Sequence, residues 1–96
     1  MIKENIIISL GGSLVAPGEI DTGFLKGFKY SLKKYFGSKR FFILVGGGKI
    51  CRVYQKALLE FGAKSVDRDW MGINITRLNA EVINNYLRAM LIIKLL

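Results

Sequence analysis

The feature that most constrains this chain is a pattern that occurs twice, an apolar run that ends in consecutive glycines and leads into a helical pattern. Residues 6–10 (IIISL) precede a glycine pair, and residues 41–45 (FFILV) precede three glycines. Short runs of β-branched and aromatic residues bounded by glycine are typical of buried strands. The second run is apolar on both faces, as central parallel strands tend to be. The pattern therefore predicts two parallel strands, each with a glycine loop at its carboxyl end.

The spacing of apolar residues predicts a helix after each glycine loop. The first helix spans residues 22–36, with Asp21 in position to cap it and Gly37 in position to end it. The second spans residues 49–61 and ends at Gly62. The predicted buried face of this second helix consists of Ile50, Val53, Tyr54, Ala57 and Phe61.

A third predicted helix, residues 70–90, follows a polar connection over residues 64–69. One of its apolar stripes consists of Ile73, Ala80 and Leu87. The other consists of Met71, Ile75, Leu78, Val82 and Tyr86. A helix on the surface of a domain needs only one apolar stripe. Two stripes predict that the helix packs on its own sheet and also on a second copy, so we expect a homo-oligomer that associates through residues 70–87.

Strand, helix, strand and two helices in this order predict an α/β fold in which a helical crossover joins two parallel strands. Two strands are a poor basis for a core, because small sheets usually need three or more. The chain also ends in a strand-like apolar run, residues 90–96, which would promote aggregation if it were exposed. We therefore expect these 96 residues to be part of a larger domain.

The composition excludes several kinds of chemistry. The chain has no histidine and one cysteine, Cys51, so its own side chains cannot form a Ser-His-Asp triad, an internal disulfide or a zinc site. A lone thiol fits a reducing cytoplasm. The apolar runs are far shorter than the ~20 residues of a membrane helix, and the N-terminus lacks the pattern of a secretory signal. We therefore expect a cytoplasmic protein with no membrane partner.

The formal net charge of +8 favours an anionic partner, so the position of the charges matters. Six of the fifteen basic residues lie within residues 26–40, which contain no acid. Lys26, Lys29 and Lys33 share one helical face, which is also the pattern of an ordinary solvated surface. No recognised nucleic-acid motif or aromatic stacking platform accompanies them in the sequence. The charge therefore favours nucleotides and other small anions over nucleic acid.

The two glycine loops are the candidate anion sites. Glycine lets the backbone approach a phosphate, and the N-terminus of a following helix adds positive potential. Each loop alone could be no more than a tight turn, with Ser13 as a turn residue and Arg52 as a solvated charge. The carboxyl ends of adjacent parallel strands lie at one edge of a sheet, so together the loops could hold two phosphates near each other. That arrangement suits phosphoryl transfer, which needs mainly positioning and charge neutralisation.

Neither loop matches the common nucleotide-binding motifs, because GGGKI is not a P-loop and G-x-G-x-x-G is absent. Instead, three blocks resemble the amino acid kinase family. The blocks are residues 6–15, residues 42–49 with Arg52, and residues 69–80 (DWMGINITRLNA). The third block is similar to the long helix of one branch of that family, the uridylate kinases of archaeal type.

The resemblance implies a fold, a reaction and a set of site residues. The fold is the N-terminal part of a three-layer α/β/α sandwich with a mainly parallel sheet, and the reaction transfers the γ-phosphoryl group of ATP to UMP with Mg²⁺. The implied ATP contacts are Gly12, Ser13, Gly48 and Arg52. The implied UMP contacts are Gly47 and Asp69, the latter at the ribose hydroxyls, although Asp69 also suits a helix N-cap. The long helix would be a dimer contact within a hexamer.

The family's pattern is incomplete in this chain. Many members carry a lysine just before the first glycine pair, whereas the archaeal-type branch lacks it and this chain has Ser9 and Leu10 there. Residues 1–96 cover less than half of a typical member, so we interpret them as a single incomplete domain whose apolar tail, residues 89–96, could lie outside the family. The missing half would supply the adenine pocket and an acidic residue of the catalytic centre. We therefore assign no catalytic residue or metal ligand.

Two interpretations of the function follow from this incompleteness. The first is a fragment of the enzyme that is inactive alone, because groups needed to position both substrates are absent. The second is a non-catalytic, dimerising remnant or interaction fragment of the same fold. The sequence does not decide between them.

Overall fold

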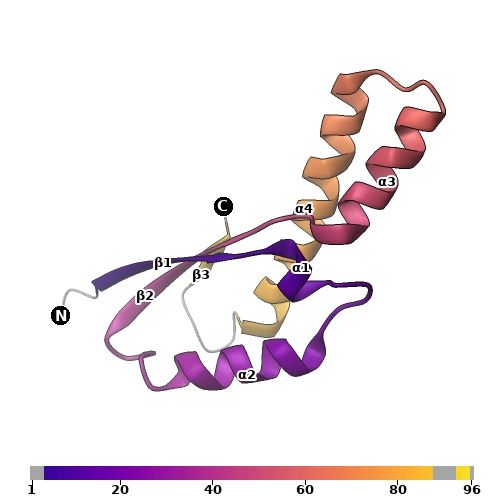
Figure 1. The fold of residues 1–96 in the computed structure, drawn as a ribbon. Coiled ribbons are helices and arrows are strands. Elements are labelled where there is room, and N and C mark those ends of the chain that lie inside the picture. Colours follow the sequence, from indigo (N-terminus) through magenta and orange to yellow (C-terminus); the bar gives the residue numbers. More distant parts are fainter. Residues whose placement is uncertain (1–3, 88–92, 96) are drawn as a thin grey trace.

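The computed structural model describes residues 4–87 and 93–95, which form an α/β fold with the elements in the predicted order. In chain order the elements are β1 (Glu4–Leu10), α1 (Gly12–Val15), α2 (Thr22–Lys33), β2 (Lys39–Val45), α3 (Gly48–Glu60), α4 (Ser65–Leu87) and β3 (Ile93–Leu95). Figure 1 shows α2 below the sheet and the α3–α4 pair projecting from the end of the sheet at which β1 and β2 finish.

The sheet has three parallel strands in the order β1-β2-β3. The predicted pair of parallel strands is confirmed, and Leu10 pairs with Val45, so β1 and β2 end at the same level. The strand-like tail supplies β3, which pairs with β2. The remaining tail positions, 89–92 and 96, lie outside the described residues.

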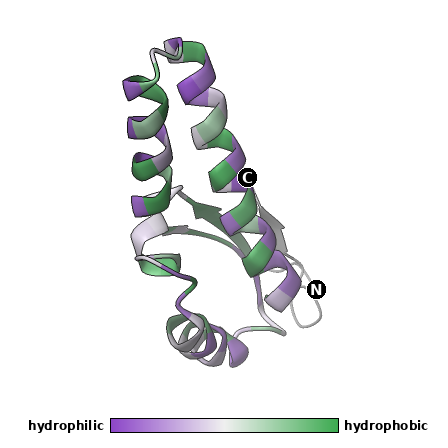
Figure 2. Cartoon of the chain, turned by 90° about the vertical axis from the view of Figure 1, so that its right-hand side faces the viewer, coloured by the Kyte–Doolittle hydropathy of each residue, from purple (hydrophilic) through white to green (hydrophobic). Residues whose placement is uncertain are grey.

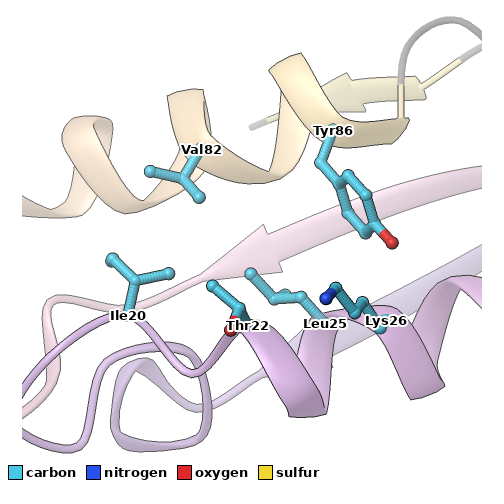
Figure 3. Close-up of a pocket in the computed structure, with 6 residues that line it drawn as sticks. All are labelled: Ile20, Thr22, Leu25, Lys26, Val82 and Tyr86. Carbon is cyan, nitrogen blue, oxygen red and sulfur yellow. The ribbon is translucent and has the colours of Figure 1, made fainter.

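Helix α2 and the C-terminal half of α4 pack on one face of the sheet. The buried core there consists of Leu10, Val15, Leu25, Ile43, Val45, Ile83 and Leu87. Asp21 caps α2 as predicted, because its carboxylate accepts a hydrogen bond from the Phe24 amide at 2.9 Å. The helix ends at Lys33 rather than at residue 36, and turns lead through Gly37 to β2. Between α2 and α4 a cavity of about 210 Å³ remains (Figure 3), lined by Ile20, Thr22, Leu25, Lys26, Val82 and Tyr86.

The opposite face of the sheet is more exposed in the described part of the chain. Ile7 of β1 is 68% exposed, and Phe42 and Leu44 of β2 on the same face are half-buried. The prediction that β1 is a buried strand is therefore wrong for this face. The physical reason is that α2 and α4 both pack on the other side, where Ile43 is fully buried.

The first glycine loop leads directly into a short helix, because α1 begins at Gly12 and continues to Val15. Val15 and Ala16 are fully buried, so this short helix anchors the first glycine loop in the core. Ser13, which the sequence also allowed as a turn residue, therefore lies in the first turn of a helix.

Helices α3 and α4 form a pair that stands away from the sheet (Figure 2) and makes the molecule 53 Å long. Gly62 ends the first of them as predicted, with a positive φ of 79° that glycine adopts without a steric penalty. The predicted buried face of α3 is wrong, since Val53, Tyr54 and Phe61 are 55%, 52% and 82% exposed. The helix packs on α4 and α1 rather than on the sheet, so it has little surface to bury.

Helix α4 begins at Ser65, earlier than predicted, and has one broad buried face instead of two separate stripes. The buried residues are Ile75, Asn79, Ile83 and Leu87. Ile83 belongs to neither predicted stripe and is fully buried, whereas Leu78 and Ile73 are 60% and 41% exposed. The two stripes are flanks of one face, because the N-terminal half packs on α3 and the C-terminal half on the sheet and α2. Self-association through this helix stays a prediction.

None of the helices in the described ranges is long and apolar enough to cross a membrane.

Candidate functional site

The two glycine loops lie against each other where β1 and β2 end. The Gly46 amide donates to the Leu10 carbonyl at 3.4 Å. A Cβ atom on Gly12 would lie 2.5 Å from the Gly46 carbonyl oxygen and would also clash with the Gly48 amide nitrogen. These neighbours are backbone atoms, which cannot rotate away as a side chain can. Glycine is therefore required at position 12 by the close approach of the two backbones.

Gly48 completes this contact at the start of α3. Its φ of +68° is in the left-handed region that favours glycine. A Cβ atom there would lie 2.7 Å from the Gly12 carbonyl carbon and 3.0 Å from the Ser13 amide nitrogen. Three of the predicted ATP contacts are therefore immediate neighbours. The fourth, Arg52, is exposed on α3 one helical turn after Gly48.

Gly47 faces the groove between α3 and α4. A Cβ atom on Gly47 would meet the Cys51 side chain at 2.5 Å and the Thr76 hydroxyl at 3.4 Å. The groove has a volume of about 470 Å³ and is lined by Cys51, Gln55, Asp69, Gly72, Ile73, Thr76 and Arg77. Asp69, one predicted UMP contact, therefore lines the same groove as Cys51 and Thr76, the two neighbours of the other, Gly47. Thr76 and Asp69 lie about 10 Å apart along the helix at ~1.5 Å per residue.

Asp69 is not the N-cap that the sequence also allowed. It lies in the second turn of α4, is exposed, and faces the groove. Asp67, in the first turn, is the acidic residue nearest the start of the helix. The earlier start of α4 therefore places the Asp69 carboxylate in the groove, where it is available to accept hydrogen bonds.

Gln55 of α3 lies against Gly72 and Arg68 of α4 in the wall of the groove. A Cβ atom on Gly72 would lie 2.7 Å from the Gln55 side-chain nitrogen, so a larger residue would displace the Gln55 amide group. Gln55 donates to the Arg68 carbonyl at 3.0 Å, and the Arg68 guanidinium donates to the Ala63 carbonyl at 2.7 Å. These bonds fix the end of the groove that lies farthest from the glycine loops.

Asn79 is a residue of the site to which the sequence analysis assigned no role. It is 5% exposed, and its side-chain amide donates to the Gly46 carbonyl at 2.9 Å and to the Gly47 carbonyl at 3.4 Å. A polar residue between Ile75 and Ile83 at helical spacing was the signal in the sequence. Its contact with the second loop is a consequence of the fold.

The donor set of the loops suits phosphate groups. Backbone amides and a helix N-terminus attract anions, and Lys49 and Arg52 add positive charge within the first turns of α3. Residues 4–87 and 93–95 contain no cluster of three or more side chains that could hold a metal ion. Mg²⁺ commonly binds through substrate phosphates and one or two carboxylates. The loop amides therefore suit the phosphates that would carry Mg²⁺, and not the ion itself.

The parallel sheet with its crossover helix and paired loops is an α/β fold of the amino acid kinase type. It superposes on the crystal structure of uridylate kinase from Archaeoglobus fulgidus with a TM-score of 0.71 and 34% sequence identity, over 85% of this chain and 36% of that one. The chain is thus related in sequence and in fold to the archaeal uridylate kinases, over about a third of their length.

Two further relatives illustrate the extent of the match. Uridylate kinase of Thermococcus onnurineus is 37% identical over 78 residues, which are 81% of this chain and 35% of that protein. Uridylate kinase of Thermoplasma volcanium is 40% identical over 80 residues, which are 82% of this chain and 34% of that protein. No protein-family profile matches the chain.

Proposed function

We propose that the chain is the nucleotide-binding N-terminal part of a uridylate kinase domain, which transfers the γ-phosphoryl group of ATP to UMP. The observation that carries this proposal is the backbone contact between the two glycine loops. Phosphoryl transfer requires donor and acceptor phosphates side by side, with their charge neutralised. Two sets of loop amides in direct contact at the ends of parallel strands supply such a pair of neighbouring phosphate sites.

The two nucleotides take opposite sides of the paired loops in this proposal. Gly12, Ser13, Gly48 and Arg52 bind the phosphates of ATP, which arrive with Mg²⁺. Gly47 binds the phosphate of UMP, and Asp69 accepts hydrogen bonds from its ribose. Support comes from the groove between α3 and α4, which is lined by Asp69 and by Cys51 and Thr76, the neighbours of Gly47.

The chain by itself is inactive in this proposal. It spans about a third of the length of the uridylate kinases it matches. Catalysis that depends on positioning fails when many of the positioning groups are absent. A cytoplasmic location, with nucleotides as the partners, completes the proposal and agrees with the single free thiol, Cys51.

A chimera tests whether these residues form a working part of the enzyme. Residues 1–87 replace the matching segment of the Thermococcus onnurineus uridylate kinase, and UDP formation is measured with ATP, Mg²⁺ and UMP. We expect turnover in the chimera and in its Gly11→Ala variant, because a Cβ atom on Gly11 meets nothing within 4 Å. We expect loss of turnover in Gly12→Ala. A chimera that folds but gives no UDP above background would contradict the proposal.

The alternative function, a non-catalytic interaction fragment, is favoured by one observation. Trp70 and Leu78 of α4 are 54% and 60% exposed, and Ile7 on the open face of the sheet is 68% exposed. Burying each such side chain in an interface stabilises a complex by roughly 1.5–3 kcal/mol. An inactive chimera together with self-association of the native chain would favour this alternative.

A further inference from the structure

The second glycine loop is attached to α4 by a single buried side chain, Asn79. Its amide group donates to two consecutive carbonyls, those of Gly46 at 2.9 Å and Gly47 at 3.4 Å. With 5% of its surface exposed, Asn79 is the buried polar residue of the described core. Three consecutive glycines lose much conformational freedom when they are ordered, so these bonds oppose an unusually large entropic cost.

The direction of the two carbonyls determines the direction of the neighbouring amides. No described peptide bond is cis, and in a trans peptide the C=O and N–H groups point in opposite directions. Because the carbonyls of Gly46 and Gly47 point toward Asn79, the N–H groups of Gly47 and Gly48 point away from it. Two successive backbone amides that point the same way are the arrangement that binds an anion.

We propose that Asn79 is a positioning residue, which orients the Gly47 amide toward the phosphate of UMP and the Gly48 amide toward the neighbouring phosphates of ATP. This inference rests on the proposed function of the loop. It adds that the hydrogen bonds of Asn79 maintain the loop's conformation. Asn79 does not touch the phosphate in this arrangement, since its side chain is on the carbonyl side of the loop. A Cβ atom on Gly47 would meet Cys51 of α3 and Thr76 of α4, so the loop is held between these two helices.

Two substitutions of Asn79 separate hydrogen bonding from packing. Asn79→Leu keeps a similar volume and cannot donate. Asn79→Asp is nearly isosteric and cannot donate while ionised, but its protonated form can donate one hydrogen bond, and burial raises the pKa of such a carboxyl. The matched control is Asn85→Asp, because Asn85 is an exposed residue of the same helix whose amide donates to the Glu81 carbonyl.

The experiment uses the full 96-residue chain, labelled with ¹⁵N and titrated with UMP and with inorganic phosphate at pH 7 and pH 5. Each variant's affinity is divided by that of the parent at the same pH, because phosphate itself titrates between these values. We expect Asn79→Leu to weaken UMP binding about tenfold at both pH values, which corresponds to about 1.4 kcal/mol. We expect Asn79→Asp to bind weakly at pH 7 and to recover most of the parent affinity at pH 5, while Asn85→Asp follows the parent.

The outcomes separate this inference from the proposed function. If the parent binds UMP and Asn79→Leu binds it within twofold, the positioning role is wrong and the proposed function stands. If the parent shows no shift of its loop amides with either probe at millimolar concentration, the proposed site fails and the inference fails with it. If Asn79→Leu does not fold, Asn79→Asp decides, since an equal loss at pH 5 and pH 7 would indicate a packing role only.

Discussion

Replacing Gly12 by alanine is the sharpest test of the contact between the two loops. The new Cβ atom would lie 2.5 Å from the Gly46 carbonyl oxygen, whereas real Cβ atoms essentially never approach closer than 3.0 Å. The loops must therefore separate by at least 0.5 Å, the difference between these two distances. Both partners are backbone, so the cost falls at the upper end of the range for overpacking, about 3 kcal/mol.

The neighbouring glycine provides a control one residue away. Gly11 has φ −59° and ψ 136°, which any residue adopts, and a Cβ atom there meets nothing within 4 Å. Gly11→Ala should therefore leave stability unchanged or raise it by about 0.4–1 kcal/mol through the unfolded state.

Thermal unfolding followed by circular dichroism measures the difference between the two variants. At about 4–8 °C per kcal/mol for a domain of this size, Gly12→Ala should unfold about 12–24 °C below the parent. Melting temperatures within 3 °C of each other for the two variants would refute the argument that the loops touch through their backbones.

Three further predictions concern activity, association and the groove. The native chain should form no UDP from ATP, Mg²⁺ and UMP in a coupled assay, and turnover above background would show that the missing part is dispensable. If the parent sediments as a dimer at tens of micromolar, Leu78→Lys should shift it toward the monomer, because this side chain is 60% exposed; a dimer of unchanged stability would place the interface elsewhere. Val82 is unsuitable for that test, because it lines the cavity between α2 and α4. In the active chimera, Asp69→Asn should raise the KM for UMP and leave that for ATP nearly unchanged, and an equal rise in both would argue against a ribose contact.

Local patterns in the sequence were sufficient to predict the main helices and strands and the class of fold. The two apolar runs that end in glycine form adjacent parallel strands. Asp21 caps the start of α2 and Gly62 ends α3, as predicted. Each of these features depends on neighbours within a few residues. The glycines also marked the candidate loops, because the left-handed backbone at Gly48 favours glycine and the close approach at Gly12 leaves no room for a Cβ atom.

Burial depended on tertiary packing, which local periodicity does not specify. The apolar face of α3 is largely exposed, and the two apolar stripes of α4 proved to be flanks of one face. The direction in which a helix buries its surface changes along its length when it leaves one neighbour and meets another. The spacing of apolar residues in the sequence of α4 does not show where the helix changes its packing partner.

The role of Asn79 is the clearest case of a feature that only the tertiary structure decided. The sequence shows only that Asn79 is a polar residue on an apolar helical face. Such a residue could equally have no specific hydrogen-bond partner. Its partners, Gly46 and Gly47, precede it by 33 and 32 residues and lie in the loop between β2 and α3. A hydrogen bond between groups so far apart in the chain exists only because α4 crosses the ends of the strands, and that crossing is set by the packing of Ile83 and Leu87 on the sheet.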